Sequence, residues 1–403
     1  MIETSALGPK IFLITGEPSG DQLAADLMAG LKAEARARGL AEPRFTGVGG
    51  ERMTARGLEL ILPMGAFAVM GLLEVLPRAL AIKRHIRHLA DEIIRQNPDV
   101  IVTVDSWGFT GRLNARLKAL GSKIPRVHYV APMVWVWKQN RARDVAARVD
   151  RLLTLWPFEA KHFEPLGLDC VHVGHSVVSS GADQGNGLAF RQRHSIPEDA
   201  DLLVVLPGSR VGEVTRLLPV FGAVVAQLAQ DPAQKNLHVA IPTLAHLRDK
   251  VDEATQGWPA KILLLDGEQE KYDAYAAARG ALAASGTVTL ELALAGLPHV
   301  IAYRLNALTY MIFRRLNKAP FVNLINILLG RAVVPELIQG ECAPEPIVTA
   351  LTPLLRDQTA RDAQQAAFAE ASTKLAGPPG SGGKADPART AAQAVWELIT
   401  PNG

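Results

Sequence analysis

Residues 206–214, LPGSRVGEV, place Ser209 and Arg210 in a glycine turn between an apolar run and an apparent helix start. A guanidinium offers planar paired donors, and backbone N–H groups at a helix start point outward, so this combination suits a phosphate. A surface arginine on an ordinary strand-to-helix turn is the simpler alternative. The turn therefore predicts a candidate anion site.

A second turn of the same kind lies in residues 284–296, ASGTVTLELALAG. Ser285, Gly286 and Thr287 would open a helix directly after an apolar run, which exposes amides with the helix dipole behind them. One turn later Glu291 could accept hydrogen bonds from two neighbouring hydroxyls, such as those of a ribose. A solvent-facing glutamate is the alternative.

Two further candidates follow apolar runs in the first half of the chain. Asp105 ends the run DVIVTVD, where a carboxylate could act as a general base, although a helix-capping aspartate is the alternative. The segment GEPSGD follows IFLIT and is either a binding turn or a helix cap. Its candidate binding residues are Gly16, Ser19, Gly20 and Asp21.

Several chemistries lack their motifs. The sequence has no G-x-G-x-x-G fingerprint, Walker A motif, metal-binding histidine pair or nucleophile elbow. Its two cysteines, Cys170 and Cys342, lie far apart without a partner motif. Such sparse cysteines are typical of a protein in a reducing compartment, and they exclude a metal site made of thiolates. We therefore expect no cofactor and no metal, with charge on a leaving phosphate stabilised by the protein itself.

The elements that must position these residues are apolar runs alternating with helical patterns, which predicts an α/β fold with parallel sheets. In open parallel sheets ligands bind outside the carboxyl ends of the strands, where all the candidate turns fall. The predicted strands are 11–15, 99–104, 125–130, 150–155, 201–206, 237–242, 261–266, 280–285 and 299–303.

The polar run 179–188, SSGADQGNGL, predicts a linker between a first domain at 1–178 and a second at 188–376. A further tether, GPPGSGGKADP at 377–387, precedes a last helix at 386–403. That helix would pack back on the first domain or reach a second subunit in a homodimer.

Composition narrows the partners. A formal net charge of +3 over 403 residues does not favour nucleic acid, and no run reaches about 18 apolar residues. We expect a cytoplasmic protein, since the N-terminal segment has no cleavage signal.

One stretch, residues 66–89, combines apolar and basic side chains and predicts peripheral docking to an anionic membrane. A core helix with a solvated basic face is the alternative. Its apolar members are Phe67, Val69, Met70, Leu72 and Leu73, and its basic members are Arg78, Lys83, Arg84 and Arg87. The segment 307–318, ALTYMIFRRLNK, is a second candidate.

Over almost its whole length the sequence resembles the lipid-A-disaccharide synthase family. The matching motifs are GEPSGD, GVGGERM, AVMGLLEVL, YVAPMVWVWKQNR, WPFE, VGHS, LPGSR, ASGT and VNLINILLGRAVVPELIQGEC. The resemblance implies a GT-B architecture, in which two Rossmann-like domains face each other across a cleft. It also implies an inverting, metal-independent hexosyltransferase that works at the inner face of the cytoplasmic membrane.

The implied reaction moves 2,3-diacylglucosamine from UDP to the 6-hydroxyl of 2,3-diacylglucosamine 1-phosphate, giving the β-1,6 disaccharide of lipid A and UDP. The implied catalytic residues are Asp105, Arg210 and Asn326, and the implied UDP contacts are Ser209, Ser285, Gly286, Thr287 and Glu291. The family usually has a second acidic residue shortly after the one that matches Asp105, and this sequence has Gly108 at that position. His175, in VGHS, would contact ligand or hold the domain junction.

Two other functions fit the same nucleotide cradle. One is another UDP-sugar enzyme of this architecture, such as a UDP-N-acetylglucosamine 2-epimerase or a peptidoglycan glycosyltransferase. The other is an inert nucleotide-sugar-binding protein that attaches to membranes. The other UDP-sugar enzymes do not predict the apolar stretch near Met70 or the VNLINILLGR run, and the inert protein would bind membranes or partners through its tethered C-terminal helix.

Overall fold

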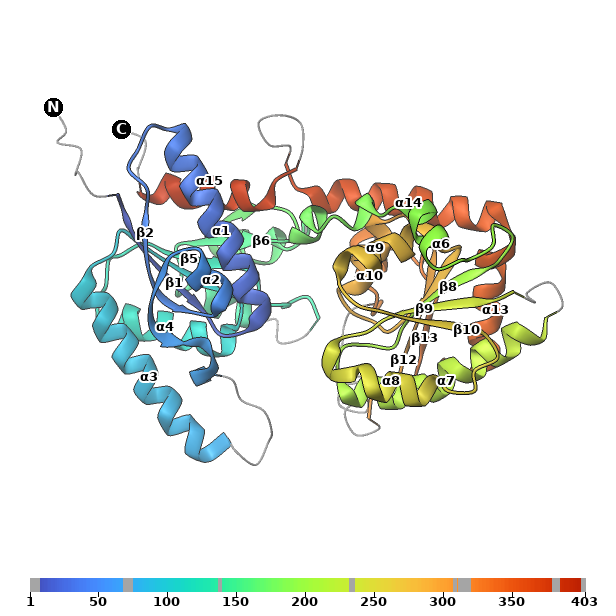
Figure 1. Cartoon of the computed structure of the whole chain (residues 1–403). Helices are drawn as coiled ribbons and strands as arrows, with labels where there is room; N and C mark the ends of the chain where they lie inside the picture. The colour runs from blue at the N-terminus through green and yellow to red at the C-terminus, as the bar shows by residue number, and fades with distance from the viewer. Residues whose placement is uncertain are drawn as a thin grey trace. The chain divides into compact units, whose positions relative to one another are not determined.

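The computed structural model describes residues 8–67, 75–136, 140–231, 236–306, 310, 320–378 and 385–399, without the side chains of 66, 67 and 75–80. The chain forms two compact units, one of Met1–Ser176 with Leu375–Gly403 and one of Val177–Lys374 (Figure 1). Residues 179–188, interpreted above as a linker, belong to the second unit. There they contain the 3-10 turn η6 (Ala182–Gln184) and the first residues of helix α6.

The first unit is built on a seven-stranded parallel sheet with the order β3-β2-β1-β4-β5-β6-β7. Its strands are β1 (Lys10–Thr15), β2 (Arg44–Gly49), β3 (Leu58–Pro63), β4 (Val100–Val104), β5 (Arg126–Tyr129), β6 (Arg151–Thr154) and β7 (Asp169–His172). Its helices are α1 (Pro18–Ala37), α2 (Glu51–Ala55), α3 (Val75–Gln96), α4 (Trp107–Ala119), α5 (Arg141–Ala146) and α15 (Pro387–Ile399).

The C-terminal helix α15 packs on α1 of the same chain, although more than 300 residues separate them in sequence (Figure 1). Gly30 allows the close approach, because a Cβ atom there would lie 2.7 Å from the carbonyl oxygen of Ala388. The indole of Trp396 is buried, and its Nε1 donates to the carbonyl of Leu31 at 3.2 Å. The last helix is thus part of the first unit.

The second unit has a six-stranded parallel sheet with the order β10-β9-β8-β11-β12-β13. Its strands are β8 (Leu202–Leu206), β9 (His238–Pro242), β10 (Lys261–Leu265), β11 (Gly280–Ala283), β12 (His299–Tyr303) and β13 (Glu336–Ile338). Its helices are α6 (Gly187–Arg193), α7 (Val211–Gln230), α8 (Arg248–Thr255), α9 (Glu268–Ala277), α10 (Val288–Leu294), α12 (Leu324–Leu329), α13 (Pro344–Arg356) and α14 (Gln358–Ala376), which ends across the boundary of the units.

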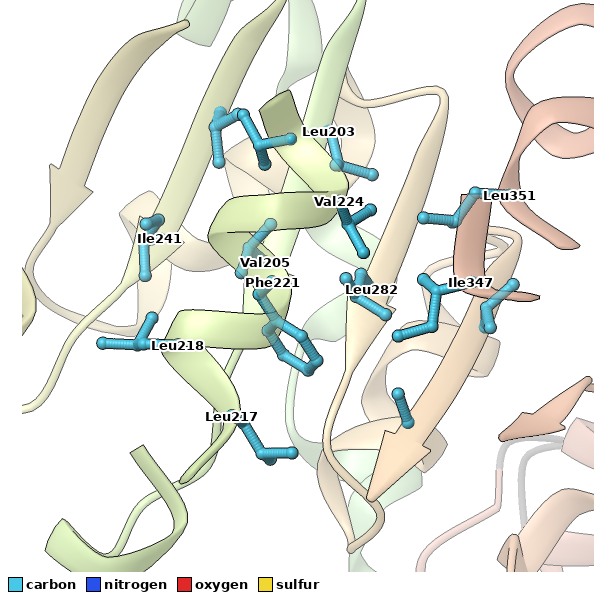
Figure 2. Packing of buried hydrophobic residues seen from close by; sticks show 14 of the residues in the cluster. Leu203, Val205, Leu217, Leu218, Phe221, Val224, Ile241, Leu282, Ile347 and Leu351 are labelled. Atoms are coloured by element: carbon cyan, nitrogen blue, oxygen red, sulfur yellow. The ribbon is translucent and has the colours of Figure 1, made fainter. Parts of the chain in front are cut away.

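Helix α7 covers one face of this sheet through a continuous apolar core (Figure 2). Phe221 and Val224 of α7 are fully buried against sheet residues such as Val205, and α13 adds Ile347 and Leu351. Each such side chain contributes about 1.5–3 kcal/mol through burial. By length and composition α7 alone among the described helices could cross a membrane, but half of its apolar window is buried in this core.

The two parallel α/β sheets predicted from the sequence are confirmed, and every predicted strand is present. Four strands were not predicted, namely β2, β3, β7 and β13. They include three of the four strands at the sheet edges, and β3, β7 and β13 are partly exposed, so they lack the continuous apolar run of a central strand.

Candidate active site

Asp105 lies immediately after β4, and its backbone is in the left-handed region with φ of 52°. Ser106 follows with φ of 47°, and Val130, just after the neighbouring strand β5, has φ of 80°. Such conformations cost of order 1–3 kcal/mol each for residues other than glycine, and they cluster at functional sites. The adjacent ends of β4 and β5 are therefore a strained segment that displays the Asp105 carboxyl.

The surrounding hydrogen bonds hold this strained turn in place. The Asp105 amide donates to the carbonyl of Tyr129 at 2.9 Å, which continues the sheet by one residue. The Thr110 hydroxyl donates to the carbonyl of Asp105 at 2.9 Å, and α4 begins directly behind it. The turn is fixed from both sides before any ligand binds.

The Asp105 carboxyl is half-buried, and its pKa is raised above the ordinary value. Burial is the main cause, the Ser106 amide opposes it, and the negative charge of Glu17 raises the pKa further. A carboxylate with a raised pKa is a stronger base than one in water. Asp105 therefore stays the candidate general base that the sequence predicts.

The GEPSGD segment follows β1, which pairs with β4, so Gly16 lies beside the Asp105 turn. A Cβ atom on Gly16 would lie 3.0 Å from the hydroxyl oxygen of Ser106. Glu17 is the N-cap residue of α1 and is exposed. It was not among the residues singled out from the sequence, although its place after β1 could have identified it.

The other residues of this segment have structural contacts. A Cβ atom on Gly20 would lie 2.0 Å from the hydroxyl of Thr15, so only glycine lets α1 approach the strand end. The buried Asp21 carboxylate accepts hydrogen bonds from the amides of Gly50, Arg52 and Met53 at 2.8–3.3 Å, which caps α2. Ser19 is exposed in the first turn of α1.

In the second unit the two predicted anion turns follow adjacent strands, β8 and β11. The Ala284 amide donates to the carbonyl of Leu206 at 2.8 Å, so the two turns leave the sheet side by side. Gly286 and Thr287 are exposed, as is Arg210, whose side chain is 80% accessible. The sheet therefore brings Arg210 and the Ser285–Thr287 turn to the same edge.

The turn before α7 is supported by Glu213, a buried residue that sequence reasoning did not single out. Its carboxylate accepts hydrogen bonds from the amides of Ser209 and Arg210, from the Arg210 Nη1 and from the Tyr303 hydroxyl at 2.9–3.3 Å. Gly208 has φ of 110°, and a Cβ atom there would lie 2.6 Å from Glu213 Oε2. Glu213 takes the third helical position of a capping box, but Arg210 stands where the sequence signature has Ser or Thr, so the sequence did not mark it.

Glu291 lies on α10, a helix of seven residues that begins at Val288 after the N-cap Thr287. Its carboxylate is paired with Lys271 of α9, with 2.9 Å between Oε2 and Nζ. Burial opposes the charge on Lys271, yet Glu291 outweighs it and the pKa of Lys271 is raised. Glu291 is thus held in place by an ion pair in the first turn of α10, and it is not a mobile surface side chain.

Asn326 has no exposed surface, and its carboxamide is fully used within the protein. Its Nδ2 donates to the carbonyl of Val334 and to Glu336 Oε1, both at 2.8 Å. Its Oδ1 accepts from the amides of Val333 and Val334, both at 2.9 Å. The structure places Asn326 as a clamp between α12 and the strand β13, without contact to solvent.

Of the predicted membrane segment, residues 68–74 lie outside the described residues, including Val69, Met70, Leu72 and Leu73, and the side chains of Phe67 and Arg78 are not described. The described part of α3 buries Ile86, Leu89 and Ile93 in the core. Its opposite face exposes Lys83, Arg84 and Arg87. Of the second candidate segment, 307–318, only Tyr310 is described.

His175 packs its ring against Trp156, with 5.3 Å between ring centroids, and burial lowers its pKa to about 4. Its amide donates to the carbonyl of Leu375 at 2.8 Å, within the first unit. In the part of the chain that the structure describes, no group of three or more His, Cys, Asp or Glu side chains is arranged to hold a metal ion.

Comparison with known proteins identifies what this arrangement is similar to. Residues 11–377 match the family model described as lipid-A-disaccharide synthetase. A lipid-A-disaccharide synthase of Rhodospirillum centenum is 45% identical over 390 residues, which cover 97% of this chain and 94% of that protein. The synthase of Paramagnetospirillum magneticum is 46% identical over 391 residues, covering 96% and 97%.

Solved structures share the fold at much lower identity. Acinetobacter baumannii MurG has a TM-score of 0.58 at 13% identity, with 97% of this chain and 99% of that chain covered. A UDP-GlcNAc 2-epimerase of Neisseria meningitidis, bound to UDP-GlcNAc, has a TM-score of 0.58 at 10% identity, with 98% and 100% covered. These two likenesses concern the fold alone.

Proposed function

This chain belongs to the lipid-A-disaccharide synthetase family, and we propose how its two units divide the work of that family's glycosyl transfer. The observation that carries the function is the match over nearly the whole chain to relatives at 45–46% identity. The chain is a UDP-sugar-dependent glycosyltransferase of lipid A synthesis. Its substrates are UDP-2,3-diacylglucosamine and 2,3-diacylglucosamine 1-phosphate.

In the reaction the 6-hydroxyl oxygen of the acceptor bonds to the anomeric carbon of the donor sugar. The bond from that carbon to the diphosphate oxygen breaks, UDP leaves with the electron pair, and the configuration inverts. An alcohol is too weak an acid to ionise alone, so Asp105 would take its proton, an effect of about 10²–10⁴-fold on rate. The raised pKa of Asp105, caused mainly by burial, supports this role.

The second unit would stabilise the departing diphosphate. Arg210 supplies a guanidinium whose Nη1 donates to Glu213, and the neighbouring turn carries the amides of the exposed residues Gly286 and Thr287. Donors fixed before the reaction stabilise charge that develops in the transition state. Ser209, Ser285 and Glu291 would contact the rest of UDP, as the family resemblance implies.

We propose that transfer needs no metal ion. The placement of Arg210 and the Ser285–Thr287 turn at the same edge of the sheet supports the idea, because the protein then supplies positive charge and donors of its own. The test incubates the protein with both substrates in excess EDTA and looks for the disaccharide by mass spectrometry. Undiminished product is expected, and product that needs added divalent cation would contradict this part of the proposal.

The same assay separates the chain from the other UDP-sugar enzymes of this fold. An epimerase would change the donor sugar without using the acceptor, and an inert binding protein would release no UDP. Disaccharide formed with stoichiometric UDP is expected. If the protein binds UDP but forms no disaccharide, that result would contradict the proposed function.

We also propose peripheral attachment to the inner face of the cytoplasmic membrane, because both substrates are acylated. The exposed basic face of α3, with Lys83, Arg84 and Arg87, supports contact with anionic lipid. In a flotation assay the protein should rise with vesicles containing phosphatidylglycerol and detach in high salt. Binding that is absent or insensitive to salt would contradict the electrostatic contribution.

A further inference from the structure

Three aromatic side chains gather at the carboxyl ends of β5 and β6, in the loops that follow these strands, and the ring of His175, which follows β7, packs behind them. Phe158 packs edge-on against Trp135 with 5.3 Å between ring centroids, and it stacks on Trp156 at 6.0 Å. Trp156 is buried and contacts His175 behind it, whereas Trp135 and Phe158 are half-buried. The cluster therefore has a covered side and an accessible side.

A buried carboxyl fixes the loop that carries these rings. Glu159 Oε2 accepts hydrogen bonds from the amides of Leu155 and Trp156, each at 3.1 Å. Burial raises the pKa of Glu159 to about 8, so the group is neutral below that pH. The aromatic loop is thus held rigid at neutral pH without a negative charge beneath it.

The accessible side of the cluster is apolar with a cation at one end. Met133, two residues before Trp135 in the loop after β5, has 52% of its surface exposed. Lys161 is exposed, and its Nζ lies 6.0 Å from the centre of the Phe158 ring. A ligand here would meet apolar surface and a positive charge side by side.

We propose that Met133, Trp135, Phe158 and Lys161 form the subsite for the acylated, phosphorylated end of the acceptor sugar. The 2-acyl chain would lie along Met133, Trp135 and Phe158, and the anomeric phosphate would pair with Lys161. This inference rests on the proposed function, which supplies an acceptor of that chemistry.

The acyl and phosphate groups are neighbours on the acceptor, as the apolar surface and Lys161 are neighbours in the protein. The acylated carbon 2 and the phosphorylated carbon 1 are neighbours on the glucosamine ring, so an apolar surface and a cation must also be neighbours. The 6-hydroxyl projects from the other side of the ring. One subsite can therefore bind the acyl chain and the phosphate while leaving the nucleophile free.

The sheet places this subsite on the same edge as the proposed base. Strands β4, β5 and β6 are consecutive in the sheet, and Asp105 follows β4 whereas Phe158 and Lys161 follow β6. Two strand spacings are about 10 Å, which is the scale of a hexose with its substituents. The 6-hydroxyl would thus point along the edge towards Asp105.

Steady-state kinetics with the full chain test the subsite. The variants are Lys161→Met, which keeps the aliphatic stem, and Trp135→Ala, with Leu166→Ala as a control at another exposed apolar position of the first unit. Lys161→Met should raise KM for the acceptor about fivefold. Trp135→Ala should raise it about tenfold. The KM of the donor should not change in either variant, and Leu166→Ala should resemble the unaltered protein.

Two altered acceptors sharpen the result. The effect of Lys161→Met should disappear with an acceptor that lacks the phosphate, and the effect of Trp135→Ala should shrink with short acyl chains. Acceptor KM values within twofold of the unaltered enzyme in both variants would overturn the subsite. If the circular dichroism spectrum shows that Trp135→Ala is unfolded, the acceptor KM of Lys161→Met, a change at an exposed position, decides the test. An unaltered protein that forms no disaccharide would instead contradict the proposed function.

Discussion

Glu213 Oε1 lies 2.9 Å from Nη1 of Arg210, so an almost buried carboxylate pairs with one terminal nitrogen of a guanidinium whose side chain is 80% exposed. The same oxygen accepts a hydrogen bond from the Tyr303 hydroxyl at 2.9 Å. A buried charge is stable when it is paired and fully hydrogen-bonded. Glu213 therefore fixes both the turn and the direction of Arg210 before a phosphate arrives.

Glu213→Ala should weaken UDP binding about tenfold, since the loss of charged hydrogen bonds in the turn costs about 1.5–3 kcal/mol. Isothermal titration calorimetry with UDP measures the effect. The double variant with Arg210→Ala should bind hardly more weakly than Arg210→Ala alone, because the two residues act together. Strictly additive losses would contradict the coupling, and Leu188→Ala, at an exposed position of the second unit, is the control.

Glu17→Gln should move the acidic limb of the kcat/KM profile to lower pH. The negative charge of Glu17 raises the pKa of Asp105, so removing it lets Asp105 ionise at lower pH. The measurement is kcat/KM for the acceptor against pH, at saturating UDP-sugar, for the unaltered protein and for Glu17→Gln. An unmoved or upward-shifted limb would show that the two carboxyls do not interact in this way.

Asn326→Ala should destabilise the protein, because it leaves buried partners of the carboxamide unpaired at a cost of about 1–3 kcal/mol for each group. Urea unfolding should show a lower midpoint, and lost activity should accompany lost stability. The exposed Asn140, which makes no cap hydrogen bond, offers a matched Asn140→Ala control. Full stability combined with lost activity would point instead to a direct catalytic role.

Glu159 should make stability fall as pH rises. Its pKa is raised by burial from 4.5 to about 8, so between these values the folded protein binds a proton that the unfolded chain has lost. The stabilisation is complete below about pH 4.5 and is lost as pH approaches 8. Thermal unfolding of the unaltered protein and of Glu159→Gln should therefore converge at low pH and diverge with rising pH. Parallel curves would contradict the raised pKa.

Much of the fold follows from the sequence because buried parallel strands are continuous apolar runs. IFLIT and DLLVVL were identified in this way, and the candidate turns after them were placed correctly at the ends of β1 and β8. The partly exposed edge strands β3, β7 and β13 lack that signal. The polar run 179–188 looked like a linker, but it packs within the second unit, where the Asn186 amide donates to the Asp273 carboxylate at 2.8 Å.

The details of the site needed three-dimensional structure. The left-handed backbone of Asp105 and Val130 has no sequence signal, because tertiary contacts impose it on residues that rarely adopt it. The clamp formed by Asn326 depends on partners that the fold brings to it. Glu213 also lacks a sequence signature, because Arg210 stands where a capping box has Ser or Thr.

The division of labour between the two units is tested most directly by measuring turnover and UDP affinity together in Asp105→Asn and Arg210→Ala. We predict that Asp105→Asn lowers turnover at least about a hundredfold and binds UDP as the unaltered enzyme does. Arg210→Ala should lose both turnover and UDP affinity. Near-normal turnover in Asp105→Asn, or unchanged UDP affinity in Arg210→Ala, would contradict the account.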